Sequence, residues 1–474
     1  MIWSIAWKNI WRNKARSMVI LGAIALGLLA GIFAIAVMAG MVDERVENAI
    51  NNEVSHVQIH HQKYLQNDEP QYTILNAQDV IAEAEKTPGV VAVSSRLRIN
   101  GMANTSGNST GVMIYGIHPE KEKKVTKINQ HIIENTGEYL FEDNRNKILI
   151  GEKMAEKLNL VHYELTDDAI AALEEAEIPK DLLEQTDTLK NELFRGEEDF
   201  REALEPYLDN NEIEKYFSSY KEAAKIFKTR SKIVLTFQDA SGNITGAAFR
   251  IAGIYSITNS VYEGMNVFVR YEDLARIANI DSAAVHEIAM LIEDREFSAS
   301  VGNTLQDEFK NITVRTWKEI QPDLALTTDY IQITYYIVIT FILLALGFGI
   351  VNTMLMAVLE RIKELGMLMA IGMNKKRVFL MIMLETVFLT LTGAVVGMAL
   401  SVGVIALTQS TGIDLSKYAE GFQAIGYSAI VYPKLDYSFF FSVTLLVIAT
   451  GILSSIYPAI KALKLNPVEA TRTE

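Results

Sequence analysis

Four long runs of apolar residues organise this chain. They cover residues 18–41, 330–359, 378–409 and 437–460, and Glu385 is the one charged residue inside them. An α-helix rises about 1.5 Å per residue, so about 20 apolar residues are enough to cross the hydrocarbon core of a bilayer. Each run is longer than that, and the pattern therefore predicts a membrane protein with four transmembrane helices.

The runs are unevenly spaced, because 288 residues, 42–329, separate the first from the second. We expect one large domain there and short connections elsewhere. The expected segments are an amphipathic interfacial helix at 1–16, transmembrane helices at 17–41, 330–359, 378–409 and 437–460, a cytoplasmic segment at 360–377, a short outer loop at 410–436 and a tail at 461–474.

Basic residues predict the orientation of the helices, because they mark the cytoplasmic side of a membrane. The N-terminal 17 residues, 360–377 and 461–474 together carry 12 basic and four acidic residues, so the rest of the chain carries −22 of the overall net charge of −14. We expect both termini in the cytoplasm and a strongly acidic large domain outside it. The basic residues are Lys8, Arg12, Lys14, Arg16, Arg361, Lys363, Lys375, Lys376, Arg377, Lys461, Lys464 and Arg472.

A cleaved signal peptide is the alternative reading of the first run. The apolar part of a signal peptide is about 7–15 residues long and is followed by small residues, whereas this run has 24 residues and leads into Val42 and Asp43. We therefore expect a retained anchor. The chain has no cysteine, which excludes disulfides and thiolate metal sites.

The first residues have an amphipathic pattern. Trp3, Trp7 and Trp11 fall on one helical stripe with Ala6 and Ile10, and Lys8 and Arg12 lie beside it. Aromatic rings next to cations favour a helix that lies on the inner leaflet as an interfacial anchor. The alternative is a plain orientation signal.

Small and polar residues inside the apolar runs suggest how the helices pack. Gly27 and Gly31, and likewise Gly393 and Gly397, have the GxxxG spacing that lets two backbones approach closely. Asn352 and Thr353 are expected to form hydrogen bonds between helices rather than to bind a solute. For Glu385, an acid inside the membrane, a structural role at the interface or opposite an arginine is favoured over a transport role.

The large domain has the pattern of an α+β fold. Alternating strands are predicted at 54–60, 90–93, 112–117, 233–237 and 244–257, with a hairpin turn at 239–243. Helices are predicted at 77–85, 152–159, 271–278 and 297–309. Residues 161–230 differ, because 162–230 hold 19 acids and nine bases with helical spacing at 169–176, 180–194 and 212–227. They predict an acidic helical insert whose acids form a solvated face or dock a partner.

Catalytic and metal-binding motifs are missing from the sequence. His56, His60 and His61 lie close together, but no HExxH motif or Gly-x-Ser-x-Gly elbow accompanies them. No GxxxxGK[ST] motif occurs either, so the chain has no P-loop for ATP. We expect no enzyme activity, cofactor, metal or nucleic-acid partner for this chain.

Several motifs resemble one known family. They are 352–356 (NTMLM), 360–366 (ERIKELG), 370–373 (AIGM), Tyr457-Pro458-Ala459 and 467–470 (PVEA), with 116–120 (GIHPE), 148–151 (ILIG), 233–237 and 251–254 in the large domain. With the layout of one helix, a large domain and three helices, they resemble permease subunits of the MacB/FtsX/LolC–LolE superfamily of ABC transporters, called type VII. The lipoprotein-release branch, LolC/LolE, looks most similar. The acidic insert and Thr471 depart from the family pattern.

The resemblance implies a fold and a set of partners. The fold is a four-helix membrane part with a MacB-like periplasmic core domain, in the inner membrane of a bacterium. The partners are a cytoplasmic ABC ATPase dimer that holds ATP and Mg²⁺, a second permease subunit as homodimer or heterodimer, the lipid bilayer and a periplasmic lipoprotein carrier. The residues assigned to ATPase coupling are Glu360, Arg361, Ile362, Glu364, Leu365, Gly366, Met369 and Gly372.

The sequence around that segment fits a mechanical role. Val358, Ile362, Leu365 and Met369 recur at helical spacing and predict an apolar stripe for a partner groove. Gly372 can end the helix and Asn374 can cap the next one. We predict a lever with a hinge at each end, while the alternative is an ordinary cytoplasmic loop.

The expected function is ATP-driven release of lipoproteins from the inner membrane toward the outer membrane, by mechanotransmission. MacB-like efflux of small molecules or peptides is the first alternative, and FtsX-like regulation of a cell-wall hydrolase is the second. The 288-residue domain is larger than FtsX-type outer domains, which disfavours the last.

Overall fold

The structure is a computed structural model that describes residues 2–64, 69–74, 76–141, 146–434 and 438–464. The chain forms two compact units. The helical unit contains Met1–Glu44, Leu326–Ala419 and Ser428–Glu474, and the large domain contains Arg45–Ala325 with Glu420–Tyr427. The expected motif at 467–470, Thr471, Arg472 and the start of the fourth run at Tyr437 lie outside the described residues.

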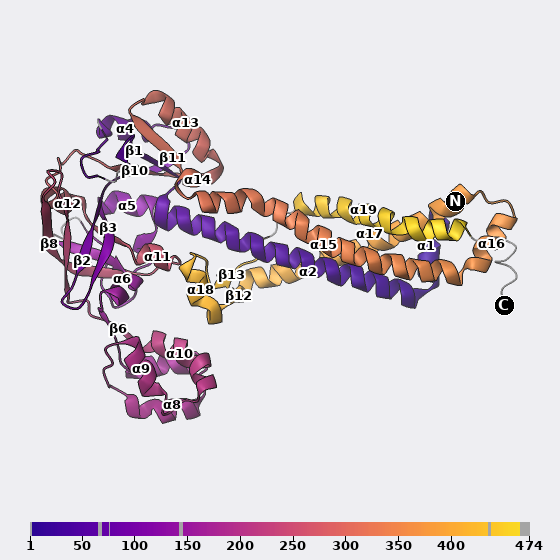
Figure 1. Cartoon of the computed structure of the whole chain (residues 1–474), viewed down its shortest axis with the longest axis horizontal. Helices are drawn as coiled ribbons and strands as arrows, with labels where there is room; N and C mark the ends of the chain where they lie inside the picture. Colours follow the sequence, from indigo (N-terminus) through magenta and orange to yellow (C-terminus); the bar gives the residue numbers. More distant parts are fainter. Residues whose placement is uncertain (1, 65–68, 75, 142–145, 435–437, 465–474) are drawn as a thin grey trace. The chain divides into compact units, whose positions relative to one another are not determined.

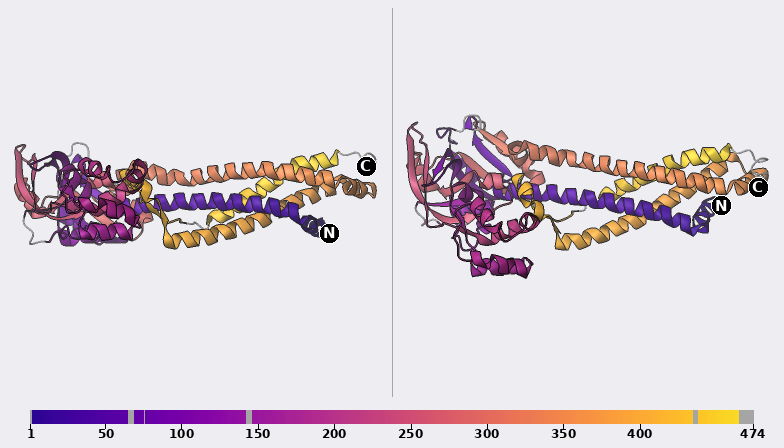
Figure 2. Two further views of the ribbon diagram at one scale, coloured as in Figure 1. Left: turned by 90° about the horizontal axis from the view of Figure 1, so that it is seen from below. Right: turned by 60° about the horizontal axis from the view of Figure 1, so that its bottom comes forward.

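The helical unit is built from long helices that lie side by side in the views of Figures 1 and 2. Four helices of the described chain are long and apolar enough to cross a membrane, in agreement with the pattern of apolar runs. Their buried side chains form one apolar cluster along the unit. The helices are α1 (Ile2–Arg12), α2 (Lys14–Ala49), α15 (Pro322–Glu360), α16 (Ile362–Ala370), α17 (Lys375–Thr411) and α19 (Ser438–Leu463).

The helix boundaries follow local sequence signals. The helix expected at 1–16 ends at Arg12, and α2 begins after a break at Asn13. The side chain of Asn374 accepts a hydrogen bond from the Lys376 backbone N–H and caps α17, as expected. At its other end, α17 stops at Gly412, whose φ of +73° most residues avoid. The 410–436 connection contains α18 (Ala419–Ala424) and the short pair β12 (Ile413–Asp414) and β13 (Ile430–Val431).

The large domain contains a nine-stranded sheet in the order β11-β1-β10-β2-β3-β9-β4-β8-β7. Strand β2 also pairs with β7, so the six strands from β2 to β7 close into a barrel. The first half of β2 pairs with β10 outside the barrel. The strands are β1 (Val57–His61), β2 (Val90–Asn104), β3 (Ser109–Ile117), β4 (Lys147–Gly151), β7 (Lys232–Gln238), β8 (Ile244–Tyr255), β9 (Asn266–Arg270), β10 (Glu287–Ile292) and β11 (Ile312–Thr316).

Short helices accompany the sheet and complete the expected α+β fold. The predicted helices are all present, with ends that differ by one or two residues. The predicted strands are present too, although Val54 ends a π-helical turn (Ile50–Val54) rather than starting β1. The helices are α4 (Ala77–Ala84), α5 (Pro119–Val125), α6 (Glu152–Lys157), α11 (Ser260–Glu263), α12 (Tyr271–Ile277), α13 (Ser298–Glu308) and α14 (Trp317–Ile320).

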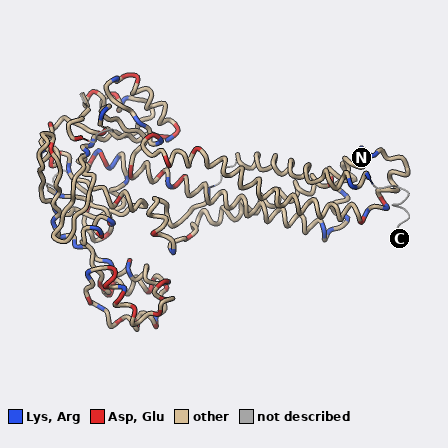
Figure 3. Tube along the Cα trace, viewed as in Figure 1, with Lys and Arg blue, Asp and Glu red and all other residues tan. Residues whose placement is uncertain are grey.

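The insert is helical and rich in acids, as Figure 3 shows. It consists of β5 (Val161–Tyr163), α7 (Asp167–Glu175), α8 (Lys180–Thr186), α9 (Glu197–Leu204), α10 (Asn210–Ala224) and β6 (Lys225–Phe227). Two helix predictions were too long. The helix expected over 180–194 ends at Thr186, and the one over 212–227 ends at Ala224, because residues 225–227 pair with β5 instead.

The insert is anchored on the barrel. Its buried side chains, among them Phe200 and Tyr220, belong to the same apolar cluster as the barrel interior. The Lys225 ammonium at the base of the insert pairs with Glu152 of α6. The insert therefore shares a core with the domain rather than hanging on a free linker.

Candidate functional site

The segment expected to couple to a partner is a short helix between two breaks. Helix α15 ends at Glu360, Arg361 has the non-helical dihedrals φ −106° and ψ 18°, and α16 begins at Ile362. At the other end Gly372 has a φ of +100°. A residue with a side chain rarely adopts that φ. The segment is thus a separate helix rather than an extension of α15.

Ion pairs tie α16 and the end of α15 to their neighbours in the helical unit. Arg361 donates to Glu385 of α17, with Nη1–Oε distances of 3.0 and 3.3 Å. Arg12 of α1 donates to Glu364 of α16 at 2.7 and 2.8 Å. Arg16 of α2 pairs with Glu360. The structure thereby gives Glu385 an arginine partner, which is one of the two structural roles expected from its sequence position.

The pair between Arg12 and Glu364 also changes the titration of the acid. Its hydrogen bond to Arg12, and then the one to Arg361, hold the pKa of Glu364 below its ordinary value. Glu364 is therefore ionised at neutral pH. The pair nevertheless lies on the surface, where water and salt weaken it.

A cavity of about 250 Å³ lies behind these ion pairs. It is bounded by α1, α2, α15 and α17. Its lining residues are Asn9, Ile10, Arg12, Asn13, Arg16, Ser17, Ile20, Met354, Ala357, Glu360, Arg361, Glu385 and Leu389.

The apolar stripe expected to dock a partner is turned into the helical unit. Val358 and Leu365 are buried in its apolar cluster, and Met369 packs against that cluster. Helix α16 instead exposes Met367, 58% accessible, while Ile371 directly after it is 79% accessible. The inward stripe could not be distinguished from an outward one in the sequence, because both have helical spacing.

The GxxxG glycines lie where helices touch. A Cβ on Gly397 would lie 2.9 Å from the Ala25 Cα, and one on Gly393 would lie 3.0 Å from Ile24, so α17 approaches α2 closely there. Gly27 and Gly31 of α2 instead accommodate the ends of the Leu346 and Ile342 side chains of α15. Helix α2 is packed between α15 and α17 through these positions.

Asn352 does not have the packing role expected for it. Its side chain is exposed on α15, and no hydrogen bond from it is found to any residue that the structure describes. The Thr353 hydroxyl donates to the Gly349 carbonyl of its own helix. Neither residue joins two helices within this chain.

Helix α1 buries one side and exposes its tryptophans. Ala6 and Ile10 are buried, whereas Trp3, Trp7 and Trp11 are exposed. The rings of Trp3 and Trp7 also contact Phe388 of α17. This arrangement suits a helix at a membrane interface, because the exposed rings can reach headgroups while the other face packs on the helical unit.

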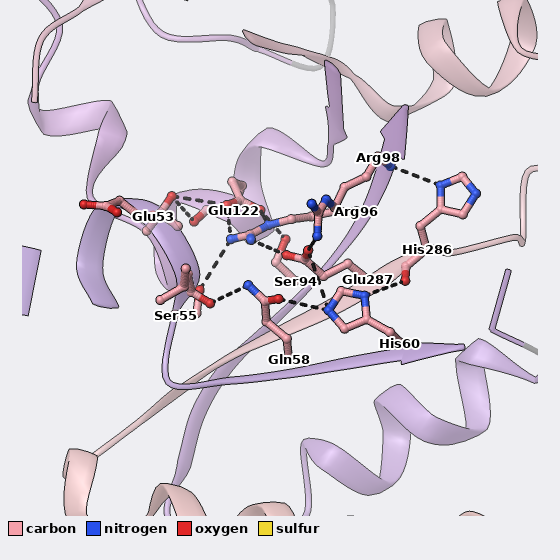
Figure 4. Close-up of polar contacts among 12 residues, drawn as sticks. Glu53, Ser55, Gln58, His60, Ser94, Arg96, Arg98, Glu122, His286 and Glu287 are labelled. Carbon is pink, nitrogen blue, oxygen red and sulfur yellow. Dashed lines mark hydrogen bonds and ion pairs between the residues drawn. The ribbon is translucent and has the colours of Figure 1, made fainter. Parts of the chain in front are cut away.

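A second polar cluster lies inside the large domain (Figure 4). Arg96 of β2 donates to Glu122 of α5 at 2.7 Å and to Glu287 of β10 at 2.5 Å. Burial disfavours charge, but Arg96 and Arg98 outweigh it and hold the pKa of Glu287 below its ordinary value. The same two acids, Glu122 and Glu287, raise the pKa of Arg96. No sequence motif pointed to this cluster, because its members are 26 to 191 residues apart.

The histidines that we considered as metal ligands belong to that cluster or border it. His60 is fully buried and has Gln58 and the His286 carbonyl as hydrogen-bond partners. Burial lowers the pKa of both His56 and His60 to about 4. They are neutral at pH 7. Among the described residues no group of three His, Asp or Glu side chains is arranged to hold a metal ion.

Glu53 joins the two ends of the large domain that continue into the long helices. It accepts hydrogen bonds from Arg45 and from Gln321, each at 2.8 Å. Arg45 lies in α2, and Gln321 directly precedes α15. Because both partners bind the one buried carboxylate, Glu53 holds the end of α2 next to the start of α15 inside the large domain.

Two family models match the chain. The FtsX-like permease C-terminal model matches residues 336–467, and the MacB-like periplasmic core domain model matches residues 17–167. Together they cover more than half of the 474 residues.

Similar proteins of known name are ABC transporter components. The macrolide export ATP-binding/permease protein MacB of Bdellovibrio bacteriovorus is 36% identical over 27% of this chain and 17% of its own length. The MacB of Chlorobium luteolum is 32% identical over 36% and 23%. The chain thus spans less than a quarter of these two relatives. The ABC transporter permease YtrF of Bacillus subtilis is 25% identical over 77% of this chain and 86% of its own.

Two solved structures are similar over part of the chain. The extracellular domain of YknZ, a transporter of Gram-positive bacteria, matches 55% of this chain and 99% of its own at 12% identity and a TM-score of 0.28. The periplasmic region of MacB from Actinobacillus actinomycetemcomitans matches 60% and 98% at 12% identity and a TM-score of 0.30.

Proposed function

The chain belongs to the MacB/FtsX superfamily of ABC-transporter permeases, and on that premise we propose that it transmits the movement of a partner ATPase through its long helices to the large domain. The observation that carries this proposal is the arrangement around Arg361. Helix α15 is unbroken over 39 residues and ends at Glu360, directly before Arg361. Arg361 then pairs with α16 on one side and with α17 on the other. A displacement of α16 would therefore act directly on a continuous rod.

The docking face for the ATPase is the exposed side of α16. Met367 and Ile371 are exposed apolar side chains at i and i+4, and Lys363 lies on the same face one turn earlier. An apolar helix face fits a groove in a partner, and methionine adapts to such grooves. The buried Leu365 and the partly buried Met369 face the helical unit, so they would move with α16 against its apolar cluster.

The work on the outer side is export of an amphipathic cargo. The uncharged stretch of α15, 30 residues from Tyr330 to Leu359, is about 45 Å long, whereas the hydrocarbon core is about 30 Å thick. A tilt of about 40° still leaves part of it outside. Its exposed side chains at the outer end include Tyr330, Ile333 and Ile337. Such an apolar ridge beyond the membrane suits a cargo with an acyl chain or a flat apolar body.

The class of cargo separates the two functional hypotheses. Relatives named for macrolide export favour a small amphiphile, and release of lipoproteins is the narrower alternative. For either cargo we infer from the basic segments that the protein lies in a bacterial inner membrane, with both termini on the cytoplasmic side and the large domain on the outer side. A second permease subunit completes the assembly, because four helices are few for a transport path.

The docking face can be tested in the assembled complex. Met367→Ala with Ile371→Ala removes two exposed apolar side chains, which weakens the complex with the ATPase about 30-fold if each contributes about 1 kcal/mol. Met356→Ala is the matched control, because Met356 is 54% accessible but lies in α15. Binding to the ATPase in detergent is the measurement. Unchanged binding by the double variant would exclude this face.

The cargo is tested in proteoliposomes with the ATPase. We expect ATP-dependent export of a fluorescent macrolide and no release of a triacylated protein. Release of the acylated protein without macrolide export would replace the first hypothesis with lipoprotein release. ATP hydrolysis without either movement would leave regulation of a separate hydrolase as the function.

A further inference from the structure

The cavity at the end of the helical unit has an amphipathic lining. Ile10, Ile20, Met354, Ala357 and Leu389 form its apolar wall. The rest of the lining is polar and consists of three arginines, two acids, two asparagines and Ser17. A cavity of about 250 Å³ has room for several waters or for one small polar group with part of an apolar chain.

The arginines keep hydrogen-bond donors for a further partner. In the described part of the chain, the ion pairs of Arg12 and Arg16 use the Nη2 atom alone. Arg361 uses Nε and Nη1. Since a guanidinium has five N–H donors, the Nε and Nη1 groups of Arg12 and Arg16 remain available. Two arginines with free donors beside one cavity suit the oxygens of a phosphate.

The level of the cavity identifies the source of the phosphate. Arg16 lies two residues before the apolar run of α2, and Arg361 lies two residues after that of α15. The exposed tryptophans lie in α1, the helix that also contributes Asn9, Ile10 and Arg12 to the lining. Basic and aromatic residues at the ends of membrane helices lie at headgroup depth. A soluble anion such as free phosphate has no apolar part that could pack against the five apolar side chains of the lining.

We propose that this cavity binds the headgroup of an anionic phospholipid of the inner leaflet, with the phosphate at Arg12 and Arg16 and the start of an acyl chain along Ile20, Met354 and Leu389. Basic pockets between transmembrane helices on the cytoplasmic side bind anionic lipids in this way. The site rests on the proposed orientation, in which these helix ends lie on the cytoplasmic side, and it does not depend on the coupling proposed above.

The test is a binding measurement on the delipidated full chain in detergent. Short-chain phosphatidylglycerol, short-chain phosphatidylcholine and inorganic phosphate are titrated, and native mass spectrometry with the thermal shift reports binding. We expect phosphatidylglycerol to bind at least tenfold more tightly than phosphatidylcholine. Arg16→Gln should weaken it about tenfold. Ala357→Phe should weaken it as well, because it fills the cavity without changing the charge.

Lys14→Gln is the matched control, since it removes one positive charge next to Arg16 from a residue that does not line the cavity. It should change the affinity less than twofold. Asn9→Leu gives a second change of the lining at constant charge, in case Ala357→Phe fails to fold. The proposal is overturned if Lys14→Gln weakens binding as much as Arg16→Gln, if both lining variants bind normally, or if inorganic phosphate alone gives the same shift.

Discussion

The ion pair between Arg361 and Glu385 gives the sharpest test of the coupling segment. Its N–O distances are 3.0 and 3.3 Å, and the side chains are 18% and 12% accessible. Two opposite charges about 4 Å apart attract by about 4 kcal/mol at an effective dielectric constant of about 20. Desolvation offsets part of that attraction. We therefore expect an interaction energy of about 1–2 kcal/mol between the two residues.

The perturbation is a double-mutant cycle of Arg361→Gln and Glu385→Gln. Each single variant leaves one charge without its partner at a position that is largely shielded from water. Each should therefore lower the free energy of unfolding by about 2–3 kcal/mol. The double variant should be less destabilised than the sum. In proteoliposomes each single variant should hydrolyse more ATP per cargo exported, at least threefold, and the double variant should recover much of that loss.

Unfolding in detergent and ATP-coupled export are the two assays. The exposed pair of Arg16 and Glu360, whose side chains are 20% and 50% accessible, serves as the control. Surface pairs contribute about 0–1 kcal/mol, so the same cycle there should give a small interaction energy. Additive effects of Arg361→Gln and Glu385→Gln, together with normal coupling in both single variants, would refute the role assigned to this joint.

Four further predictions concern the same structure. Gly372→Val should raise ATP use per cargo, because its φ of +100° costs a side chain about 1–3 kcal/mol; Gly349→Val, which meets nothing within 4 Å, should not. Gly397→Val should lower the melting temperature, because the valine side chain would push α17 away from Ala25 of α2. Gly403→Val should leave the melting temperature unchanged, because a Cβ at Gly403 meets nothing within 4 Å. Glu364→Lys should lower export by repelling Arg12, and a second change, Arg12→Glu, should restore it; failure of that rescue contradicts the pairing. Because burial lowers the pKa of His56 and His60 from 6.5 to about 4, the folded state binds fewer protons between these values. Stability is therefore full above pH 6.5 and falls by about 3 kcal/mol per histidine toward pH 4, and His60→Gln should reduce this slope in melting curves.

Much of the architecture could be predicted from local pattern. Four apolar runs predicted four membrane helices, and alternation predicted five of the strands of the large domain. Strands β4, β5, β6, β9, β10 and β11 were missed as elements, although the 148–151 motif lies in β4. They are short, and buried short runs have no distinctive period. Closure of the barrel could not be predicted from the sequence either, because it depends on pairing between β2 and β7, which lie more than 100 residues apart.

The candidate site divides in the same way. The sequence by itself determined the four apolar helices, the helix end near Gly372, the cap at Asn374 and the spacing of the packing glycines, because each depends on neighbouring residues. Only the tertiary structure decided which face of α16 is outward, that Glu385 meets Arg361, and that Arg12 and Arg16 share a cavity. Those outcomes depend on which surfaces of distant helices meet, and helical spacing is identical for a buried stripe and an exposed one.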